Sequence, residues 1–428
     1  MATLWIEGGH RLSGRLTVEG NKNSALPLMA ACLLTDQECV LRNVPQIRDV
    51  AVMAELLTGL GATVEGVGTP TLRIRCSAIT TDRPDATLVG RLRGSVLLLG
   101  PLLARRGSAR LAPPGGDFPA RRLITTHLQA LMALGAVPLE EPGHALEVPN
   151  GLTGASVYLD EASVTATETA LLAAAAAKGP TEIRHAAMEP HVTELCRFLR
   201  VMGAGVSGEG TPTIRLDPPA RIGGAEHRLD GDYIEAGSWG VVAAITGGAI
   251  EVTGANARDL EVVAAPLKKM GVACEYDDGR FVVEARSRFA ATRRITTGLW
   301  PGFPSDMVSL VTVLATKAEG RTLVHDWLYE LRLFALEQLS AMRADLFLCD
   351  PHRIIVSGPT TLRGRSLDSR DLRSGMALIA AALAAEGEST VAPLETVERG
   401  YASLVERLRS LGAVVERDEN RRRPGTAT

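Results

Sequence analysis

The chain repeats one pattern of apolar and polar positions six times. In each copy a helix-like apolar stretch ends in Leu-Gly-Ala or a close variant, and a short segment typical of a β-strand follows. The copies of this ending start at Leu60, Leu134, Met202, Met270, Met342 and Leu411. They lie 68 to 74 residues apart, so six units of about seventy residues fill the chain.

Glycine in this ending suits a helix C-cap, because a residue without Cβ enters the left-handed backbone region without a clash. Arg343 replaces that glycine in the fifth unit, so we expect this unit to end its helix differently. Each unit also has an earlier apolar helix followed by a strand, for example residues 25–34 then 38–42, 95–105 then 109–112, and 376–385 then 389–392. The pattern predicts an α/β (α+β) chain of two globular lobes with three units each.

Composition narrows the class of protein. Apolar residues make up 46% of the chain and glycine occurs 43 times, which excludes a disordered protein. The net charge of −3 argues against a general nucleic-acid binder. Apolar runs reach about ten residues, whereas a bilayer requires ~20, and the first residues show no secretion signal. We therefore expect a cytoplasmic protein without a membrane partner. The six cysteines lack metal-ligand spacing, so we expect reduced, buried thiols.

Four predicted helices begin with residues that suit an anion site. The first starts at Gly20-Asn21-Lys22-Asn23-Ser24, where Lys22 would add a cation to the free amides of the helix start. The alternative is an Asn or Ser N-cap with a solvated lysine. The other three starts are Arg93-Gly94-Ser95, Phe303-Pro304-Ser305-Asp306 and Asp371-Leu372-Arg373-Ser374. Their recurrence at equivalent places in the unit favours a shared anionic ligand.

The segment 113–122 is rich in Pro and Gly and carries Asp117, Arg121 and Arg122. It fits a lid that closes over an anion, and the alternative is an ordinary surface turn. The chain has no P-loop, no GxGxxG after a strand, no HExxH and no GxSxG. Nucleotide hydrolysis, dinucleotide redox chemistry, zinc hydrolysis and the α/β-hydrolase triad therefore lose their usual sequence support.

Five motifs in order resemble those of the enolpyruvyl transferases, over nearly the whole chain. They are residues 20–27, 114–117 and 303–307, Asp371-Leu372-Arg373, and Glu398-Arg399-Gly400-Tyr401. The resemblance implies two lobes, each an inside-out α/β barrel of three repeats, with the active site in the cleft between them. The first lobe would span residues 22–229, including the lid loop 113–122. The second would span 1–21 and 230–417, and residues 418–428 would form a disordered tail.

The resemblance also implies a reaction. The enolpyruvyl group of phosphoenolpyruvate would pass to a hydroxyl of UDP-N-acetylglucosamine with release of phosphate, the first committed step of peptidoglycan precursor synthesis. Such chemistry needs an acid, a base, and cations for the phosphate and carboxylate groups. No metal or organic cofactor and no nucleic acid is implied, and we expect a monomer or weak homo-oligomer.

The matched positions assign roles to individual side chains. Lys22, Arg122 and Arg399 would hold the phosphate of phosphoenolpyruvate. Asp306 would be the base at the acceptor hydroxyl, and Asp117 the acid on the lid. Further substrate contacts would come from Asn23, Arg93, His127, Ser163, Val164, Arg332, Asp371 and Arg373. We expect the cations to have no counter-ions of their own when the site is empty.

The sequence departs from the family pattern at several positions. Asp117 stands where most members have the cysteine that the epoxide drug fosfomycin alkylates, which predicts an insensitive enzyme. The family pattern has Pro and Asp at Leu123 and Thr125, Lys and Gly at Glu161 and Thr165, and Arg at Tyr233. Two alternatives therefore stay open. One is a transferase of a specialised pathway that uses another nucleotide such as UMP; the other is a catalytically silent paralogue that only binds ligand.

Overall fold

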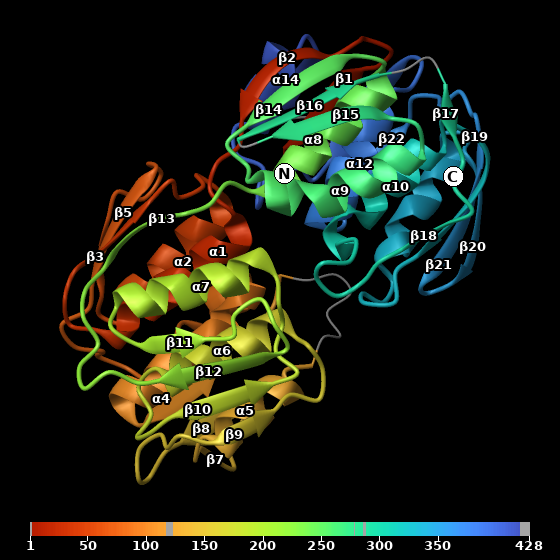
Figure 1. Cartoon of the computed structure of the whole chain (residues 1–428). Helices are drawn as coiled ribbons and strands as arrows, with labels where there is room; N and C mark the ends of the chain where they lie inside the picture. Colours follow the sequence, from red (N-terminus) through yellow and green to blue (C-terminus); the bar gives the residue numbers. More distant parts are fainter. Residues whose placement is uncertain (1, 117–122, 278, 286–287, 420–428) are drawn as a thin grey trace. The chain divides into compact units, whose positions relative to one another are not determined.

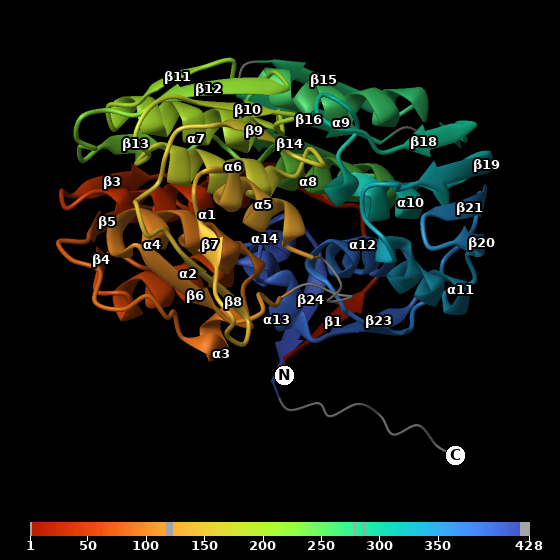
Figure 2. The same ribbon diagram turned by 90° about the horizontal axis from the view of Figure 1, so that it is seen from below.

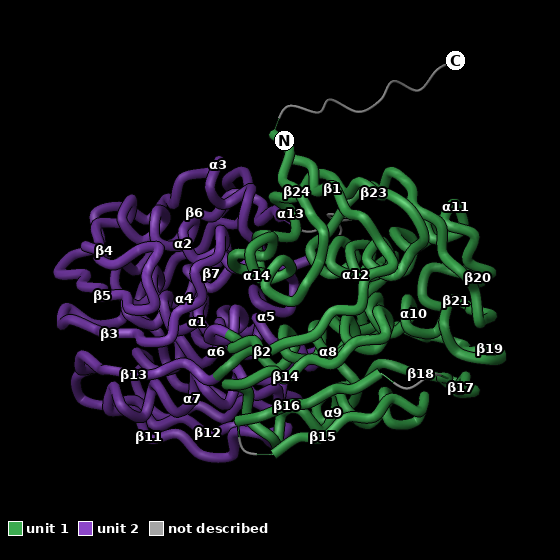
Figure 3. Tube along the Cα trace, turned by 90° about the horizontal axis from the view of Figure 1, so that it is seen from above, with its two compact units in different colours: residues 1–18, 231–428 green, residues 19–230 purple. Residues whose placement is uncertain are grey.

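The computed structural model describes residues 2–116, 123–277, 279–285 and 288–419 (Figure 1). The chain forms two compact units (Figure 3). Unit 1 consists of Met1–Val18 and Gly231–Thr428, and unit 2 of Glu19–Asp230. The chain passes between them next to Val18 and Asp230, within a few residues of the crossings that the sequence suggests near residues 21 and 230.

Unit 2 contains three sheets in its described part. The first has the order β13 (Glu226–Arg228), β3 (Cys39–Arg42), β5 (Thr71–Arg75) and β4 (Thr63–Glu65). The second runs β11 (Gly205–Ser207), β12 (Thr213–Asp217), β10 (Thr181–Arg184) and β9 (Ser156–Tyr158). The third runs β6 (Ser108–Leu111), β8 (His144–Glu147) and β7 (Val137–Pro138). In the first two sheets one end strand joins its neighbour in parallel, and the other pairs are antiparallel.

Unit 1 repeats this arrangement. Its sheets have the orders β22 (Ser366–Asp368), β23 (Glu388–Ala392), β1 (Thr3–Glu7), β24 (Val414–Asp418), and β15 (Ala273–Asp277), β16 (Arg280–Glu284), β14 (Ala249–Thr253), β2 (Ser13–Thr17). The third is β17 (Phe289–Ala290), β19 (Ala318–His325), β21 (Arg353–Gly358), β20 (Asp345–Asp350), with β18 (Arg294–Thr296) also on β19. Figure 2 shows β1 between β23 and β24. Asp418 of β24 pairs with Thr3 of β1, so the expectation of a disordered tail that starts at residue 418 is wrong for that residue.

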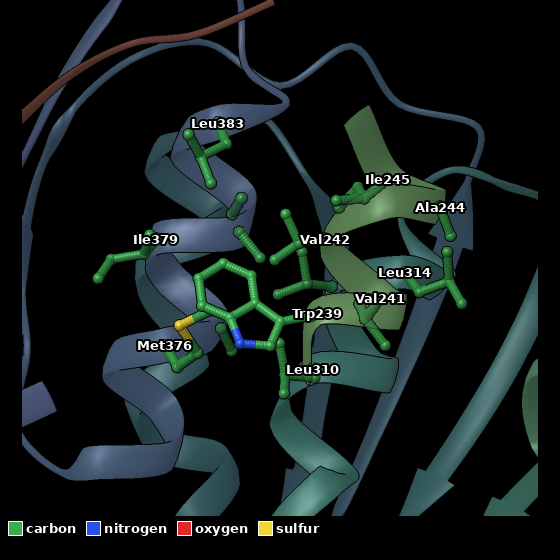
Figure 4. Packing of buried hydrophobic residues seen from close by; sticks show 14 of the residues in the cluster. Trp239, Val241, Val242, Ala244, Ile245, Leu310, Leu314, Met376, Ile379 and Leu383 are labelled. Carbon is green, nitrogen blue, oxygen red and sulfur yellow. The ribbon is translucent and has the colours of Figure 1, made fainter. Parts of the chain in front are cut away.

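Three largely apolar helices lie at the centre of each unit, and most of their residues are buried. In unit 2 these are α1 (Lys22–Ala31) continued by η1 (Cys32–Leu34), η2 (Arg93–Leu98) continued by α4 (Leu99–Arg106), and α6 (Val164–Ala174). In unit 1 they are α8 (Tyr233–Thr246), α10 (Val308–Ala315) and α12 (Leu372–Leu383). Figure 4 shows Trp239 of α8 packed between Leu310 of α10 and Met376 of α12. A helix that is apolar all round belongs inside a protein, and sheets surround these helices. The predicted inside-out α/β barrels are confirmed.

The remaining helices are amphipathic or short. Unit 2 adds α2 (Arg48–Gly59), α3 (Ala86–Val89), α5 (Thr125–Ala133) and α7 (Pro190–Val201). Unit 1 adds α9 (Ala257–Lys269), η3 (Ser305–Met307), η4 (Arg332–Glu337), α11 (Gln338–Ala341), α13 (Leu394–Val397) and α14 (Leu404–Ser410). In the part of the chain that the structure describes, none of the helices has the length and apolar character that crossing a membrane requires.

Arg343 ends its helix in the same way as the glycines of the other units. Its φ is 72°, close to the 83° of Gly271. The amide of the next residue, Ala344, bonds to the carbonyl of Leu339, just as Ala204 bonds to Leu199. This hydrogen bond over five residues is that of a Schellman cap. The prediction of a different ending for the fifth unit is wrong. The cap forms with the same hydrogen bond, although Arg343 has a left-handed backbone that strains a residue with a Cβ.

The cysteines agree with the sequence prediction at five of six positions. Cys32, Cys39, Cys76, Cys196 and Cys274 are buried and free. Cys349, on the strand β20, is free but exposed, contrary to that prediction.

Candidate active site

Asp306 lies between two buried guanidinium groups in unit 1. Its Oδ1 accepts a hydrogen bond from Nη1 of Arg332 at 3.0 Å. Its Oδ2 accepts from Nε of Arg373 at 3.1 Å and lies 2.9 Å from Nη2 of the same residue. Both nitrogens of Arg373 thus approach one carboxylate oxygen, and the other oxygen is left to Arg332. Residues that the sequence assigned to a cationic site and to the base thus form one cluster.

Helix ends place these three side chains. Asp306 belongs to the single turn η3, which starts after Pro304 and leads into α10. Arg373 is the second residue of α12, whose N-cap Asp371 accepts bonds from the amides of Arg373 and Ser374, both at 3.0 Å. Asp371 is therefore a helix cap through Oδ1, a role that the sequence analysis did not give it. Arg332 opens η4, after Leu331 has taken a left-handed φ of 65°.

Aromatic side chains hold the two guanidiniums. The Arg332 guanidinium lies 4.0 Å from the ring centre of Tyr329. Nη1 of Arg373 donates to the hydroxyl of Tyr401 at 3.4 Å, and that hydroxyl lies 2.7 Å from Oγ of Ser238. These contacts hold the two planar guanidinium groups in place and replace part of the water that a solvated arginine would bind.

Burial disfavours the charged form of both arginines, and the neighbouring carboxylates more than compensate for this effect on the pKa. Burial lowers the pKa of Arg373, but Asp306 and then Tyr401 raise it, so the pKa lies above its usual value. Burial also lowers the pKa of Arg332, and Asp306 and Asp326 raise it beyond its usual value. Burial raises the pKa of Tyr401, although Arg373 opposes this. Both arginines are cations, and Tyr401 is a neutral phenol, at physiological pH.

Lys22 and Asn23 start the helix α1 in unit 2. Oδ1 of Asn21 accepts from the amide of Asn23 at 2.8 Å, so Asn21 is the N-cap. Nζ of Lys22 lies 2.8 Å from Oδ2 of Asp49, which is buried at the start of α2. The alternative of an Asn cap is thus correct and that of a solvated lysine is wrong. The expectation that the cations have no counter-ions is also wrong for Lys22, Arg332 and Arg373.

The other predicted contacts of unit 2 lie around the starts of α5 and α6. His127 is buried on α5, and its Nε2 lies 2.7 Å from Oγ1 of Thr165 in the first turn of α6. Ser163 is the N-cap of α6 and Val164 its first residue. The Oγ1 of Thr126 donates to Oε1 of Glu161 at 3.5 Å. The structure therefore brings His127 to the Ser163–Val164 turn, and two departures from the family pattern, Glu161 and Thr165, are in the same place.

Four predicted site residues remain, and the structure describes two of them, Arg93 and Arg399. Arg93 opens η2 and donates from Nη2 to the carbonyl of Leu123 at 3.0 Å. Arg399 is half-buried in the turn after α13. Asp117 and Arg122, like the neighbouring Arg121, fall outside the described residues.

A cavity of about 450 Å³ in unit 2 contains none of the predicted site residues. Arg105 lies in its wall and donates to the carbonyls of Leu33, Cys76 and Ser77. The carbonyl of Leu33 lies at the end of η1, and those of Cys76 and Ser77 follow the strand β5, so Arg105 ties a helix end to a strand end, which is a structural role.

Sequence reasoning missed Asp49 and Asp326. Asp49 stands in the first turn of a helix, where an acid is common for its effect on the helix dipole alone, so nothing in the sequence marks it. Asp326 follows the strand β19 and resembles any loop acid, although it is fully buried.

Comparison with known proteins gives the family. Residues 6–408 match the model of EPSP synthase (3-phosphoshikimate 1-carboxyvinyltransferase). A UDP-N-acetylglucosamine 1-carboxyvinyltransferase of Bradyrhizobium diazoefficiens is 42% identical over 97% of this chain and 98% of its own. One from Treponema denticola is 40% identical over 97% and 99%.

Solved structures agree. The enolpyruvyl transferase NikO from Streptomyces tendae matches with a TM-score of 0.87 and 26% identity, over 97% of this chain and 98% of its own. An EPSP synthase from Acinetobacter baumannii shares the fold, with a TM-score of 0.75 and 20% identity over 98% and 100%. The chain belongs to the EPSP synthase family of enolpyruvyl transferases. The prediction of an enolpyruvyl (1-carboxyvinyl) transferase is thereby confirmed.

Proposed function

We propose that this enzyme transfers the enolpyruvyl group of phosphoenolpyruvate to a hydroxyl of UDP-N-acetylglucosamine and releases phosphate. The observation that carries the proposal is the Asp306–Arg332–Arg373 cluster, which joins a carboxylate to two cations. The relatives named UDP-N-acetylglucosamine 1-carboxyvinyltransferase support the choice of acceptor, since they align over nearly the full chain. In this assignment the chain carries out the first committed step of peptidoglycan precursor synthesis, in the cytoplasm, as a monomer or weak homo-oligomer.

The reaction would proceed by addition and elimination. The acceptor oxygen bonds to C2 of phosphoenolpyruvate while Asp306 takes the hydroxyl proton and Asp117 gives a proton to the methylene carbon. In the elimination the methyl group returns a proton to the Asp117 carboxylate as the bond from C2 to the phosphate oxygen breaks, and the leaving phosphate takes the proton that Asp306 accepted. Lys22, Arg122 and Arg399 would hold the phosphate, and Arg93, Arg332 and Arg373 would balance the remaining negative charge.

The ion pairs of Asp306 add a condition to this mechanism. Two guanidiniums stabilise the ionised carboxylate, which is the form that a base requires, but they also make it reluctant to accept a proton. We therefore propose that Arg332 and Arg373 turn part of their hydrogen bonds toward bound phosphoenolpyruvate. Asp306 then becomes the stronger base only when substrate is present.

The second candidate is transfer to another nucleotide such as UMP. Glu161 and Thr165 favour it, because they replace a Lys and a Gly of the family pattern at the start of α6, beside His127. The silent-paralogue alternative has less support, because Lys22, Asp306, Arg373 and Arg399 are all in place along the chain.

Phosphate release decides between these candidates. We would incubate the purified full chain with phosphoenolpyruvate and, separately, UDP-N-acetylglucosamine, UDP or UMP, and identify the product by mass spectrometry. We expect phosphate and an enolpyruvyl product with UDP-N-acetylglucosamine. Turnover with UMP alone would move the assignment to the second candidate. No phosphate with any acceptor would refute both transfer activities.

A further inference from the structure

A second carboxylate, Asp326, lies behind the Asp306 cluster in unit 1. It directly follows the strand β19 and none of its surface is exposed to solvent. Its Oδ1 accepts from Oγ1 of Thr297 at 3.0 Å and from the amide of Leu328 at 3.2 Å. Its Oδ2 accepts from Oγ of Ser305 at 2.6 Å. A buried carboxylate is stable only when its oxygens receive such bonds.

The hydroxyl of Ser305 has a direction that its neighbours determine. Nη1 of Arg332 donates to Oγ of Ser305 at 2.8 Å, and an arginine cannot accept a hydrogen bond. The single hydrogen of the hydroxyl must therefore point to Asp326. The other hydrogen of the same Nη1 goes to Oδ1 of Asp306 at 3.0 Å. Asp326, Ser305, Arg332 and Asp306 thus form one chain of hydrogen bonds with a fixed order.

We propose that Asp326 is a positioning residue for the enolpyruvyl transfer: through Ser305 it holds Arg332 in the orientation that aligns Asp306. This inference rests on the proposed role of Asp306 as the base. Asp326 itself touches neither Asp306 nor substrate in this scheme, and its effect passes through the hydroxyl of Ser305. Small displacements of reacting groups are enough to slow a reaction severely.

Replacing Asp326 by asparagine would reverse the direction of the hydrogen bond between this side chain and Ser305. The amide of Leu328 is an obligatory donor, so the side-chain oxygen of an asparagine must stay at the position of Oδ1. Its NH₂ group would then face Ser305, which already accepts from Arg332. The serine hydroxyl would have to accept twice and aim its hydrogen elsewhere, so Asp326 would no longer fix the orientation of the hydroxyl that anchors Arg332.

The test compares Asp326→Asn, Ser305→Ala and their double variant with the wild type, using the full chain. Thr297→Val is the matched control, because it removes another donor to Asp326 but leaves Ser305 and Arg332 unchanged. Ser305→Thr restores the hydroxyl and should restore much of the rate. Thermal unfolding of each variant separates loss of fold from loss of rate.

We expect Asp326→Asn and Ser305→Ala each to lower kcat by about 10- to 100-fold while KM for both substrates changes by less than about threefold. The double variant should lose no more than the worse single variant, because both changes break the same chain. Thr297→Val should keep kcat. If Ser305→Ala keeps a normal kcat, if the losses multiply in the double variant, or if Thr297→Val is as slow as Ser305→Ala, the positioning role is refuted. A wild type without turnover would instead refute the proposed function.

Discussion

The ammonium of Lys22 and the carboxylate of Asp49 form an ion pair of 2.8 Å in which the two side chains keep only 13% and 4% of their exposure. Because water is largely excluded, the attraction between the two charges is screened less than at the surface. We predict that Asp49→Asn lowers the free energy of unfolding by about 2–4 kcal/mol, since it removes the anion next to a largely buried ammonium. Denaturant unfolding followed by fluorescence measures this.

Asp36→Asn is the matched control in the same unit. Asp36 pairs with Arg221 in a bridge whose side chains are 49% and 71% exposed, so its removal should change stability little. Equal losses in the two variants would show that burial does not determine the strength of the Lys22–Asp49 pair.

Asp306→Asn should lower kcat by about 10²–10⁴ and affect the binding of phosphoenolpyruvate far less, because it removes the base and keeps the volume. Asp306 is not a helix N-cap, because Pro304 holds that position before η3 and the carboxylate of Asp306 bonds to Arg332 and Arg373. Asp85→Asn is the control. Asp85 caps α3 through the amide of Leu88, and asparagine caps equally well. Near-normal kcat for Asp306→Asn would remove it from the reaction.

Glu168→Gln should stabilise the protein at neutral and alkaline pH. Burial, and then the nearby Glu189, raise the pKa of Glu168 well above its ordinary value of 4.5. The neutral acid therefore contributes its full stability below pH 4.5, and this contribution is lost as the pH rises through the folded-state pKa. A glutamine never ionises, so its advantage should grow with pH to about 1–3 kcal/mol at pH 8.

Thermal unfolding between pH 4.5 and 8 checks this, with Glu182→Gln as the control. Glu182 pairs with Arg215 at the surface, so its variant should show no pH-dependent gain. A constant difference between Glu168→Gln and wild type at all pH values would contradict the prediction.

Arg343→Gly should stabilise unit 1 by about 0.5–1 kcal/mol, because glycine adopts the left-handed backbone without strain and this outweighs its larger unfolded-state entropy. The reciprocal change is Gly203→Ala. An added Cβ there would meet Pro219 at 3.5 Å and the carbonyl oxygen of Arg221 at 3.8 Å, both ordinary contacts, so any cost comes from the φ of 109°. It should destabilise by about 1–2 kcal/mol. Opposite signs in the two variants, measured by denaturation, would support the shared cap, and equal signs would contradict it.

Asp117→Cys should make the enzyme sensitive to fosfomycin. A carboxylate is a much weaker nucleophile toward an epoxide than a thiolate, so the wild type should form no adduct. Time-dependent loss of activity and the mass of the intact protein would both report alkylation of the variant. Asp117→Ala should lose most activity, since it can no longer supply a proton. A stable drug adduct on the wild type would overturn the prediction.

The repeats could be predicted because their signals are local in the sequence. The partners of the site residues could not, because they lie far away along the chain. The Leu-Gly-Ala endings mark caps whose hydrogen bonds span five residues, so six units could be counted from sequence. The partners of Asp306 stand 26 and 67 residues away along the chain, and no pattern of spacing reveals that they meet. For the same reason the sequence left Lys22 without its partner Asp49. The start of the helix at Arg93 was predicted, but its 3₁₀ form was not, because a short apolar turn has the same sequence pattern in both helix types.

The place of β1 between β23 and β24 sets an order for events during synthesis. The strand leaves the ribosome long before its two neighbours, at 388–392 and 414–418, are made. Unit 2 is one continuous segment and has all its strands as soon as Asp230 has emerged. It can therefore fold while the rest of the chain is still being translated, as independent domains do. The amino-terminal strand must wait, with unsatisfied backbone groups on both edges, for the last sheet to close around it.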